Sequence, residues 1–124
     1  MKRRGIVILI SDFASPDYTR EARLTGRRHD LIPVVITDKF ERELPAAPAL
    51  LVAEPLEGGP LQASDLSDPE FRRTYAEAAA ARRRKLEEVL RSAGAEWIDV
   101  DPAQPVYDPV IKFFSRRAVK FKRV

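Results

Sequence analysis

The chain has 124 residues, a formal net charge of +3 and 44% hydrophobic residues. This length suits one globular domain with a working core, so we expect a single α/β domain over residues 1–124. The absence of cysteine excludes disulfides, thiolate metal sites and cysteine nucleophiles. No apolar run approaches the roughly 20 residues that a helix needs to span a bilayer, so we expect no membrane segment in this chain. No signal peptide is recognised either.

The most apolar stretch, Gly5–Ile10, is followed at once by Ser11 and Asp12. Four of its residues are β-branched, a pattern that is typical of a parallel strand buried on both faces. Ligands bind beyond the carboxyl ends of the strands in open α/β sheets. Asp12 therefore stands where chemistry is expected on this element.

A second apolar strand, residues 31–36, runs toward another carboxylate, Asp38. The segment between the two strands predicts a helix over residues 16–28, capped by Ser15. A strand, a helix and a second strand with this spacing predict a right-handed parallel unit. Asp12 and Asp38 would then emerge on the same rim of the sheet.

The middle of the chain changes character. Residues 39–48 have no hydrophobic period and predict a surface loop. Two short stretches, residues 49–53 and 60–63, flank the turn residues 57–59. This arrangement predicts a short hairpin added at the edge of the sheet.

The last third of the chain returns to alternating helix and strand. A long helix is predicted between Ser67, spaced to form a capping box with Glu70, and Gly94, which is placed to end it. A third strand over residues 96–101 and a final helix from Asp108 complete the chain. The order predicts a small Rossmann-like, three-layer fold with three parallel strands and an edge hairpin.

No motif for catalysis is present in the sequence. There is no Gly-rich phosphate loop, and Ser11 lacks the glycine-flanked elbow of a nucleophilic serine. The single histidine, His29, falls at the predicted end of the first helix, where a packed residue or a helix-terminus cation is the common role. Asp12 and Asp38, supported by Ser11, can hold a hard cation such as Mg²⁺. The alternative is that each carboxylate caps the turn or helix that follows it.

The charge of the chain is concentrated near its end, where five of the last nine residues are arginine or lysine and none is acidic. Such a segment can contact phosphates or anionic lipid, but a solvated end is the commoner meaning. No aromatic platform or groove-reading helix accompanies it, so we do not expect nucleic acid as a partner.

Several short segments spread over nearly the whole chain form a recognisable set: Arg3–Val7, Ile10–Phe13, Arg27–Asp30, Asp38 with Glu41, Leu44–Pro45, and Asp65 ahead of Ser67–Pro69. Together they resemble the second half of the bacterial domain-of-unknown-function 58 family, which is related to von Willebrand factor type A domains. The resemblance implies that Asp12 matches the late aspartate of a metal-ion-dependent adhesion site. The family's first half, with the Asp-x-Ser-x-Ser loop that supplies most ligands, is absent, so the implied site is incomplete. No cofactor is expected in this chain, unless the missing half supplies ligands for Mg²⁺.

The resemblance also implies a function. It indicates a non-enzymatic protein-interaction module in the cytoplasm, within a parent protein that can be membrane-anchored. Family members are typically encoded beside AAA+ ATPases of the MoxR class, which implies such an ATPase as a partner. Without the family's first half, one edge of the first strand would be exposed, and exposed edges recruit strands. We expect a homodimer formed by antiparallel pairing of Gly5, Ile6, Val7, Ile8, Leu9 and Ile10.

One rival interpretation comes from the residues alone. Asp12, as nucleophile or ligand, and Asp38 could serve a magnesium-dependent phosphoryl-transfer or hydrolase domain. That chemistry needs a second acidic cluster and a basic phosphate anchor, and only Lys39 lies near in the sequence. The non-enzymatic interpretation is therefore preferred.

Overall fold

The computed structural model describes residues 3–14, 17–53 and 58–122. The chain divides into two compact units, the first made of residues 1–38 and 84–124 and the second of residues 39–83. The single domain expected from length stays a prediction, because two compact units can belong to one domain. Within the described residues, no helix has both the length and the apolar character needed to cross a membrane.

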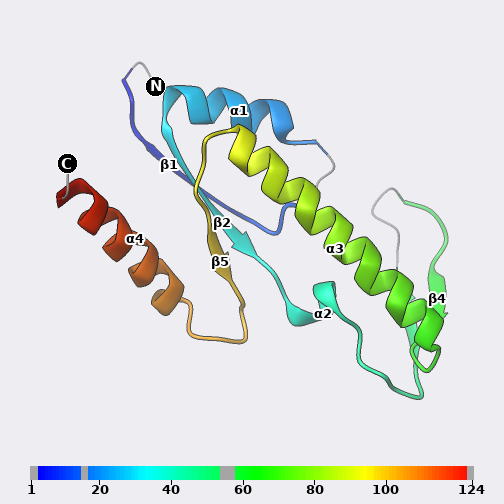
Figure 1. The fold of residues 1–124 in the computed structure, drawn as a ribbon. Coiled ribbons are helices and arrows are strands. Elements are labelled where there is room, and N and C mark those ends of the chain that lie inside the picture. Colours follow the sequence, from blue (N-terminus) through cyan, green and yellow to red (C-terminus); the bar gives the residue numbers. More distant parts are fainter. Residues whose placement is uncertain (1–2, 15–16, 54–57, 123–124) are drawn as a thin grey trace. The chain divides into compact units, whose positions relative to one another are not determined.

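The first unit is built on a parallel three-stranded sheet in the order β1-β2-β5 (Figure 1). Ile6 of β1 lies opposite Asp30 of β2, and Val34 of β2 lies opposite Ile98 of β5. The three parallel strands predicted from the sequence are confirmed, with the second strand of the chain at the centre. Their bounds are Ile6–Ser11 for β1, Asp30–Ile36 for β2 and Ile98–Val100 for β5.

Strand β2 is buried along nearly its whole length because helices cover both faces of the sheet (Figure 1). Leu31 and Val35 pack against α1 and the last turns of α3, whereas Ile32 packs against α4 on the other face. Each fully buried aliphatic side chain of this kind stabilises the fold by about 1.5–3 kcal/mol. The helices are α1 (Thr19–Arg28), α3 (Pro69–Ser92) and α4 (Tyr107–Lys122).

Strand β1 is not buried on both faces, so this part of the prediction was wrong. Ile6, Ile8 and Ile10 are 64%, 53% and 64% exposed, and only Val7 packs against the core from this strand. The reason is that α4 packs against β2 and β5, which leaves the same face of β1 without a helix. Among the described strands β1 pairs on one side only, as expected for an exposed edge.

The second unit contains the predicted hairpin, formed by β3 (Leu50–Ala53) and β4 (Gln62–Asp65). Gly58 and Gly59 in its connection have positive φ angles of 79° and 124°, which glycine adopts without strain. Glu57, the first predicted turn residue, lies outside the described residues. The expected place at the edge of the main sheet was wrong, because among the described strands β3 and β4 pair only with each other and form a sheet of their own.

Two local details of the second unit differ from expectation. The predicted loop over residues 39–48 begins with a short helix, α2 (Lys39–Arg42). Helix α3 is capped by Asp68, whose Oδ1 accepts the N–H of Glu70 at 3.0 Å, rather than by Ser67. The Ser67 hydroxyl and N–H donate instead to Asp65 Oδ1, at 2.7 and 2.9 Å. These donors hold the pKa of the Asp65 carboxyl below its ordinary value.

Helix α1 begins at Thr19, three residues later than predicted. The predicted cap, Ser15, and the following Pro16 lie outside the described residues. No side chain caps the helix at Tyr18, and Asp17 Oδ1 accepts the N–H of Thr19 at 3.3 Å. The later start agrees with the packing of Tyr18, whose ring belongs to the core beneath the helix rather than to its solvent face.

The end of α3 follows the prediction. Gly94 has a φ of 69°, and the N–H of Ala95 donates to the carbonyl of Leu90 at 3.0 Å. The N–H of Gly94 donates to the carbonyl of Arg91 at 2.9 Å. These two bonds are those of a helix that ends in a left-handed glycine, so the predicted cap is confirmed.

Helix α1 approaches the end of α3 closely at Gly26. A Cβ atom added there would overlap the carbonyl oxygen of Ala93 and lie 3.1 Å from its carbonyl carbon. Because the obstructing atoms are backbone, the helices would have to separate to accommodate it. The glycine is thus required by packing and not by its backbone conformation.

Gly26→Ala should therefore lower the free energy of unfolding by about 1–3 kcal/mol, through overpacking. An unobstructed helical glycine would behave in the opposite way, since alanine is favoured there by about 1 kcal/mol. The measurement is urea denaturation of both proteins. Arg27→Ala, at an exposed position of the same helix, is the matched control and should stay within about 0.5 kcal/mol of wild type. A stabilised Gly26→Ala protein would contradict the close approach.

The basic end of the chain is part of a helix rather than a wholly solvated tail. Arg117 of α4 donates to Asp30 Oδ2 at 2.6 Å, and its guanidinium carbon lies 4.8 Å from the centre of the Phe113 ring. The Arg117 side chain is only 18% exposed. Arg117 therefore ties α4 to the start of β2, and the solvated-end interpretation is wrong for this residue.

Arg117→Ala should cost about 1–2 kcal/mol of stability, because it removes a hydrogen bond between charged groups at a largely covered position. Its neighbour Arg116 is exposed and makes no ion pair among the described residues. Arg116→Ala should accordingly change stability by less than about 0.5 kcal/mol. Denaturation midpoints of the two variants give the comparison, and equal losses would rule out the anchoring role of Arg117.

Candidate functional site

The rim at the carboxyl ends of β1 and β2 carries the carboxylates singled out from the sequence. Since β1 and β2 are parallel and Ser11 lies opposite Val35, Asp12 and Asp38 follow their strands at the same end of the sheet. The predicted common rim is confirmed at the level of the backbone. Both side chains are exposed.

The polar groups that follow β1 make local hydrogen bonds. Asp12 Oδ1 accepts the N–H of Ala14 at 3.0 Å, and Ser11 Oγ accepts the N–H of Phe13 at 3.0 Å. Side chains of this type commonly bond to the backbone two residues ahead in tight turns. The capping interpretation therefore accounts for the observed positions of Asp12 and Ser11.

The metal interpretation needs more ligands than these residues supply. Within the part of the chain that the structure describes, no group of three or more His, Asp and Glu side chains is arranged to hold a metal ion. A hard cation bound by protein takes six or more oxygen ligands, some of them from water. A metal role for Asp12, with Ser11 and Asp38 in support, stays a prediction that depends on ligands from elsewhere.

The turn after β1 contains a feature that the sequence did not signal. Phe13 has a φ of 55°, in the left-handed region that large side chains rarely adopt. Its ring packs edge-to-face on Tyr18, with the ring centres 5.1 Å apart. Both rings contact the core that β2 forms with α3. Tertiary packing thus fixes an unfavourable backbone conformation directly after Asp12.

The lone histidine has a structural role at the other end of the strands. His29 follows α1, and its Nδ1 accepts the N–H of Gly5 at 3.2 Å. This bond holds the start of β1 beside the start of β2. Of the two roles expected from the sequence, a packed residue and a helix-terminus cation, this contact agrees with the first, and His29 lies at the opposite end of β1 from Asp12.

The open edge of β1 carries three apolar side chains that are more than half exposed, those of Ile6, Ile8 and Ile10. The carbonyl of Gly5 accepts the N–H of Asp30 at 2.8 Å, so Gly5 directs its backbone groups toward β2. Backbone groups alternate along a strand, and the parallel ladder places those of Ile6, Ile8 and Ile10 on the open side. The three isoleucines, whose side chains are more than half exposed, are therefore also the residues with outward-facing backbone groups.

A family model described as "Protein of unknown function DUF58" matches residues 1–85, which is more than half of the chain. The chain belongs to the DUF58 family. The matched part includes both strands that carry the candidate residues, together with the hairpin and most of α3. The family expected from the sequence is confirmed.

Related sequences occur in mycobacteria. The uncharacterized protein Rv1480 of Mycobacterium tuberculosis and Mb1516 of Mycobacterium bovis are each 28% identical to this chain over 117 residues. That alignment covers 94% of this chain and 36% of each relative, so the chain spans about a third of their length. The uncharacterized protein MAV169 of Mycobacterium avium is 27% identical over 117 residues, which cover 68% of that protein. No solved structure matches the chain.

The Phe13–Tyr18 contact predicts a pH dependence of stability in this DUF58 chain. Burial raises the pKa of the Tyr18 phenol above its ordinary value. The folded state thus favours the protonated phenol, and this contribution is complete below about pH 10, the pKa in the unfolded chain. It is lost as the pH rises through the higher pKa of the folded state.

Wild type should therefore lose more stability than Tyr18→Phe as the pH rises above about 10. Denaturation at a series of pH values measures the difference. Tyr107→Phe removes a tyrosine that is 65% exposed and is expected to follow the wild-type profile. If Tyr18→Phe and Tyr107→Phe gave the same profile, the burial of Tyr18 would not contribute.

Proposed function

We propose that this DUF58 chain is a non-enzymatic protein-interaction module of the von Willebrand A-like type, which associates by adding a strand to the open edge of β1. The observation that supports it most is the exposure of Ile6, Ile8 and Ile10 on an edge that no other described strand pairs with. The von Willebrand A-like and Rossmann-like descriptions are supported by three parallel strands with helices on both faces and an aspartate beyond the first strand.

The edge has none of the features that usually protect a strand from pairing. Ile6–Ile10 contains no charged residue and no proline. Proteins commonly block edge strands with lysine, proline, bulges or a covering segment, because unpaired backbone groups attract other strands. Pairing of the outward backbone groups, together with side-chain contacts between neighbouring strands, favours an added strand.

The occupant we propose for the edge is a second copy of the chain. A two-fold axis beside Ile8 places Ile8 opposite its own copy and Ile6 opposite the copy's Ile10. Outward-facing residues then meet outward-facing residues, which is the requirement for hydrogen-bonded pairs in an antiparallel ladder. Such self-complementary contacts are the common form of a homodimer. A MoxR-class AAA+ ATPase as a further partner is supported only by the family resemblance.

The first test is the solution mass of the chain, measured by light scattering with and without millimolar Mg²⁺. We expect a dimer whose mass is unchanged by the metal, because strand pairing needs no cation. A monomer in both conditions would overturn the proposal. A monomer that binds Mg²⁺ would favour the magnesium-dependent alternative, in which Asp12 and Asp38 act together at their common rim.

Variants at Ile8 connect the dimer to the edge. Ile8→Lys places two like charges opposite each other at the two-fold axis, and Ile8→Pro removes an outward N–H without affecting the ladder to β2. Both should shift the chain to monomer, with a dissociation constant raised by at least about tenfold for one lost apolar pair and its bonds. Leu24→Lys on α1 changes a residue that is 42% exposed and is the matched control. Dissociation in all three variants would argue against the β1 edge.

A further inference from the structure

The charged residues of α4 from Pro109 onward are all basic, and only some of them form ion pairs. From Pro109 to the end of the chain there is no acidic residue. Arg117 pairs with Asp30, and Lys120 Nζ lies 3.0 Å from Glu96 Oε1. Lys112 and Arg116, in contrast, make no ion pair with any part of the chain that the structure describes.

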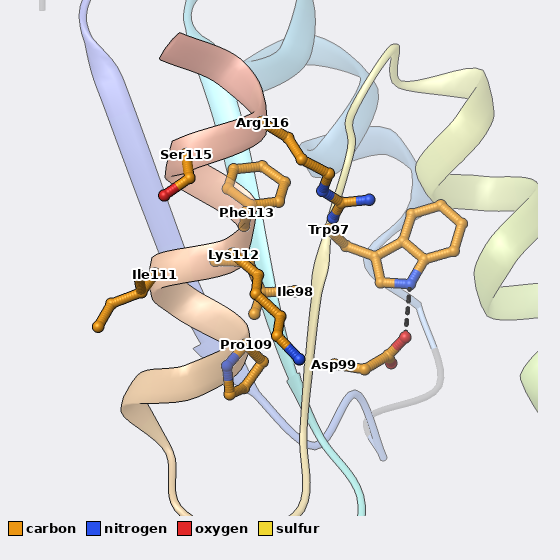
Figure 2. A pocket seen from close by; sticks show the side chains of 9 residues that line it. All are labelled: Trp97, Ile98, Asp99, Pro109, Ile111, Lys112, Phe113, Ser115 and Arg116. Atoms are coloured by element: carbon orange, nitrogen blue, oxygen red, sulfur yellow. Dashed lines mark hydrogen bonds between the residues drawn. The ribbon is translucent and has the colours of Figure 1, made fainter. Parts of the chain in front are cut away.

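These two free cations border a pocket of about 610 Å³ at the β5 side of the sheet (Figure 2). Lys112 and Arg116 are four residues apart, so they lie on the same side of α4. Figure 2 shows both side chains extending from α4 toward the segment that carries Trp97. The pocket is therefore bounded by cations of α4 and by the segment that carries Trp97, whose ring lies on the side of that segment away from α4 and packs against Leu86 and Leu90 of α3.

The other walls are mainly apolar. Ile98 and Phe113 form part of the lining and are buried in the core that joins β5 to α4. Trp97 is half-buried, and the guanidinium carbon of Arg91 lies 5.5 Å from the centre of its ring. The indole Nε1 donates to Asp99 Oδ2 at 3.3 Å. These contacts hold the tryptophan ring in place at the pocket.

The balance of charge at the pocket is positive. Lys112 and Arg116 face one carboxylate, Asp99, which already accepts a hydrogen bond from Trp97. Exposed ion pairs by themselves contribute about 0–1 kcal/mol, so a small anion would bind weakly here. A ligand that combines negative charge with an apolar group would use both the cations and the apolar walls.

We propose that this pocket binds an extended acidic peptide segment of a protein partner, one with carboxylates two residues apart and an apolar side chain near them. Carboxylates at positions i and i+2 of an extended chain are about 7 Å apart along the strand. The Cβ atoms of helical residues at i and i+4 are about 5–6 Å apart, which their long side chains can adjust. The carboxylates contact Lys112 and Arg116, and the apolar side chain packs on the apolar walls.

Nucleic acid fits the same observations less well. Binding to a phosphate backbone needs a longer track of free cations and, for single strands, several aromatic platforms. Along α4 the neighbouring cations Arg117 and Lys120 are already paired with carboxylates, and Trp97 is the only aromatic side chain at the pocket that is both partly exposed and beside the cations. Two free cations and one ring suit a short acidic segment.

The test uses Trp97 as its own reporter, since it is the only tryptophan of the chain. The probe is a capped synthetic heptapeptide in which glutamates alternate with leucine and phenylalanine, titrated into the full 124-residue chain. We expect a saturable change in tryptophan fluorescence that weakens with added salt. The same peptide with glutamine at each glutamate should bind at least about tenfold more weakly. Equal binding of the two peptides would overturn the proposal.

Charge reversal locates the binding. Lys112→Glu with Arg116→Glu should weaken binding of the acidic peptide by at least about tenfold, since two attractive contacts become repulsive. The matched control reverses two exposed arginines of α1, Arg20→Glu with Arg27→Glu, and changes the net charge equally. This control measures the general effect of net charge on peptide binding. It should bind the peptide within about twofold of wild type. Equal losses in both double variants would assign binding to net charge and reject the site.

Two further measurements keep the result interpretable. If the reversed variant were misfolded by circular dichroism, Lys112→Ala with Arg116→Ala would replace it, with a loss of binding again expected. A thymidine oligonucleotide is titrated in parallel, and tighter binding of it than of the peptide would reject an acidic protein partner. The β1 edge is separate from this pocket, so Ile8→Lys should leave peptide binding unchanged. Loss of the dimer and loss of peptide binding are thus independent outcomes.

Discussion

The first unit depends on the burial of β2. Ile32 is fully buried and Val35 is 1% exposed, on opposite faces of the same strand. Helices must therefore cover both faces, and they can do so only where apolar side chains of the sheet and the helices meet. Every other element of the unit takes its position from this strand, since β1 and β5 pair with its two sides.

This central burial makes the environment of β1 unusual. Its composition is as apolar as that of β2, but the helix on one face, α4, packs against β2 and β5 instead. Sequences are normally consistent with their surroundings at each level, and a local conflict often marks a functional surface. Pairing with another strand at this edge would satisfy the outward backbone groups of Ile6, Ile8 and Ile10. We therefore propose association through this edge.

The two edges of the sheet differ in charge. At β1 the exposed surface is apolar and uncharged, whereas at β5 it combines an aromatic ring with the free cations of α4. Two neighbouring arginines of α4 have different roles. Arg117 is partly buried and paired with Asp30, whereas Arg116 extends beside the pocket (Figure 2). We propose different partners for the two surfaces, a strand at β1 and an acidic segment at β5.

The sequence by itself determined the elements and the order in which they occur. Apolar runs marked the three strands, and Gly94 marked the end of α3, because these signals act between residues close in the chain. The common rim of Asp12 and Asp38 also followed, since parallel strands align their carboxyl ends. The family was recognisable from short segments for the same local reason.

Only the tertiary structure decided which strand would be buried and which side chains would meet. A run of apolar residues is the same for a central strand and an edge strand, so the exposure of Ile8 depends on where α4 packs. The left-handed Phe13 is held by contacts with Tyr18, against its own preference. The ion pair of Arg117 with Asp30 and the pocket beside Trp97 join residues far apart in the chain. Local propensity carries no information on such contacts, because they form only when the whole sheet and its helices pack together.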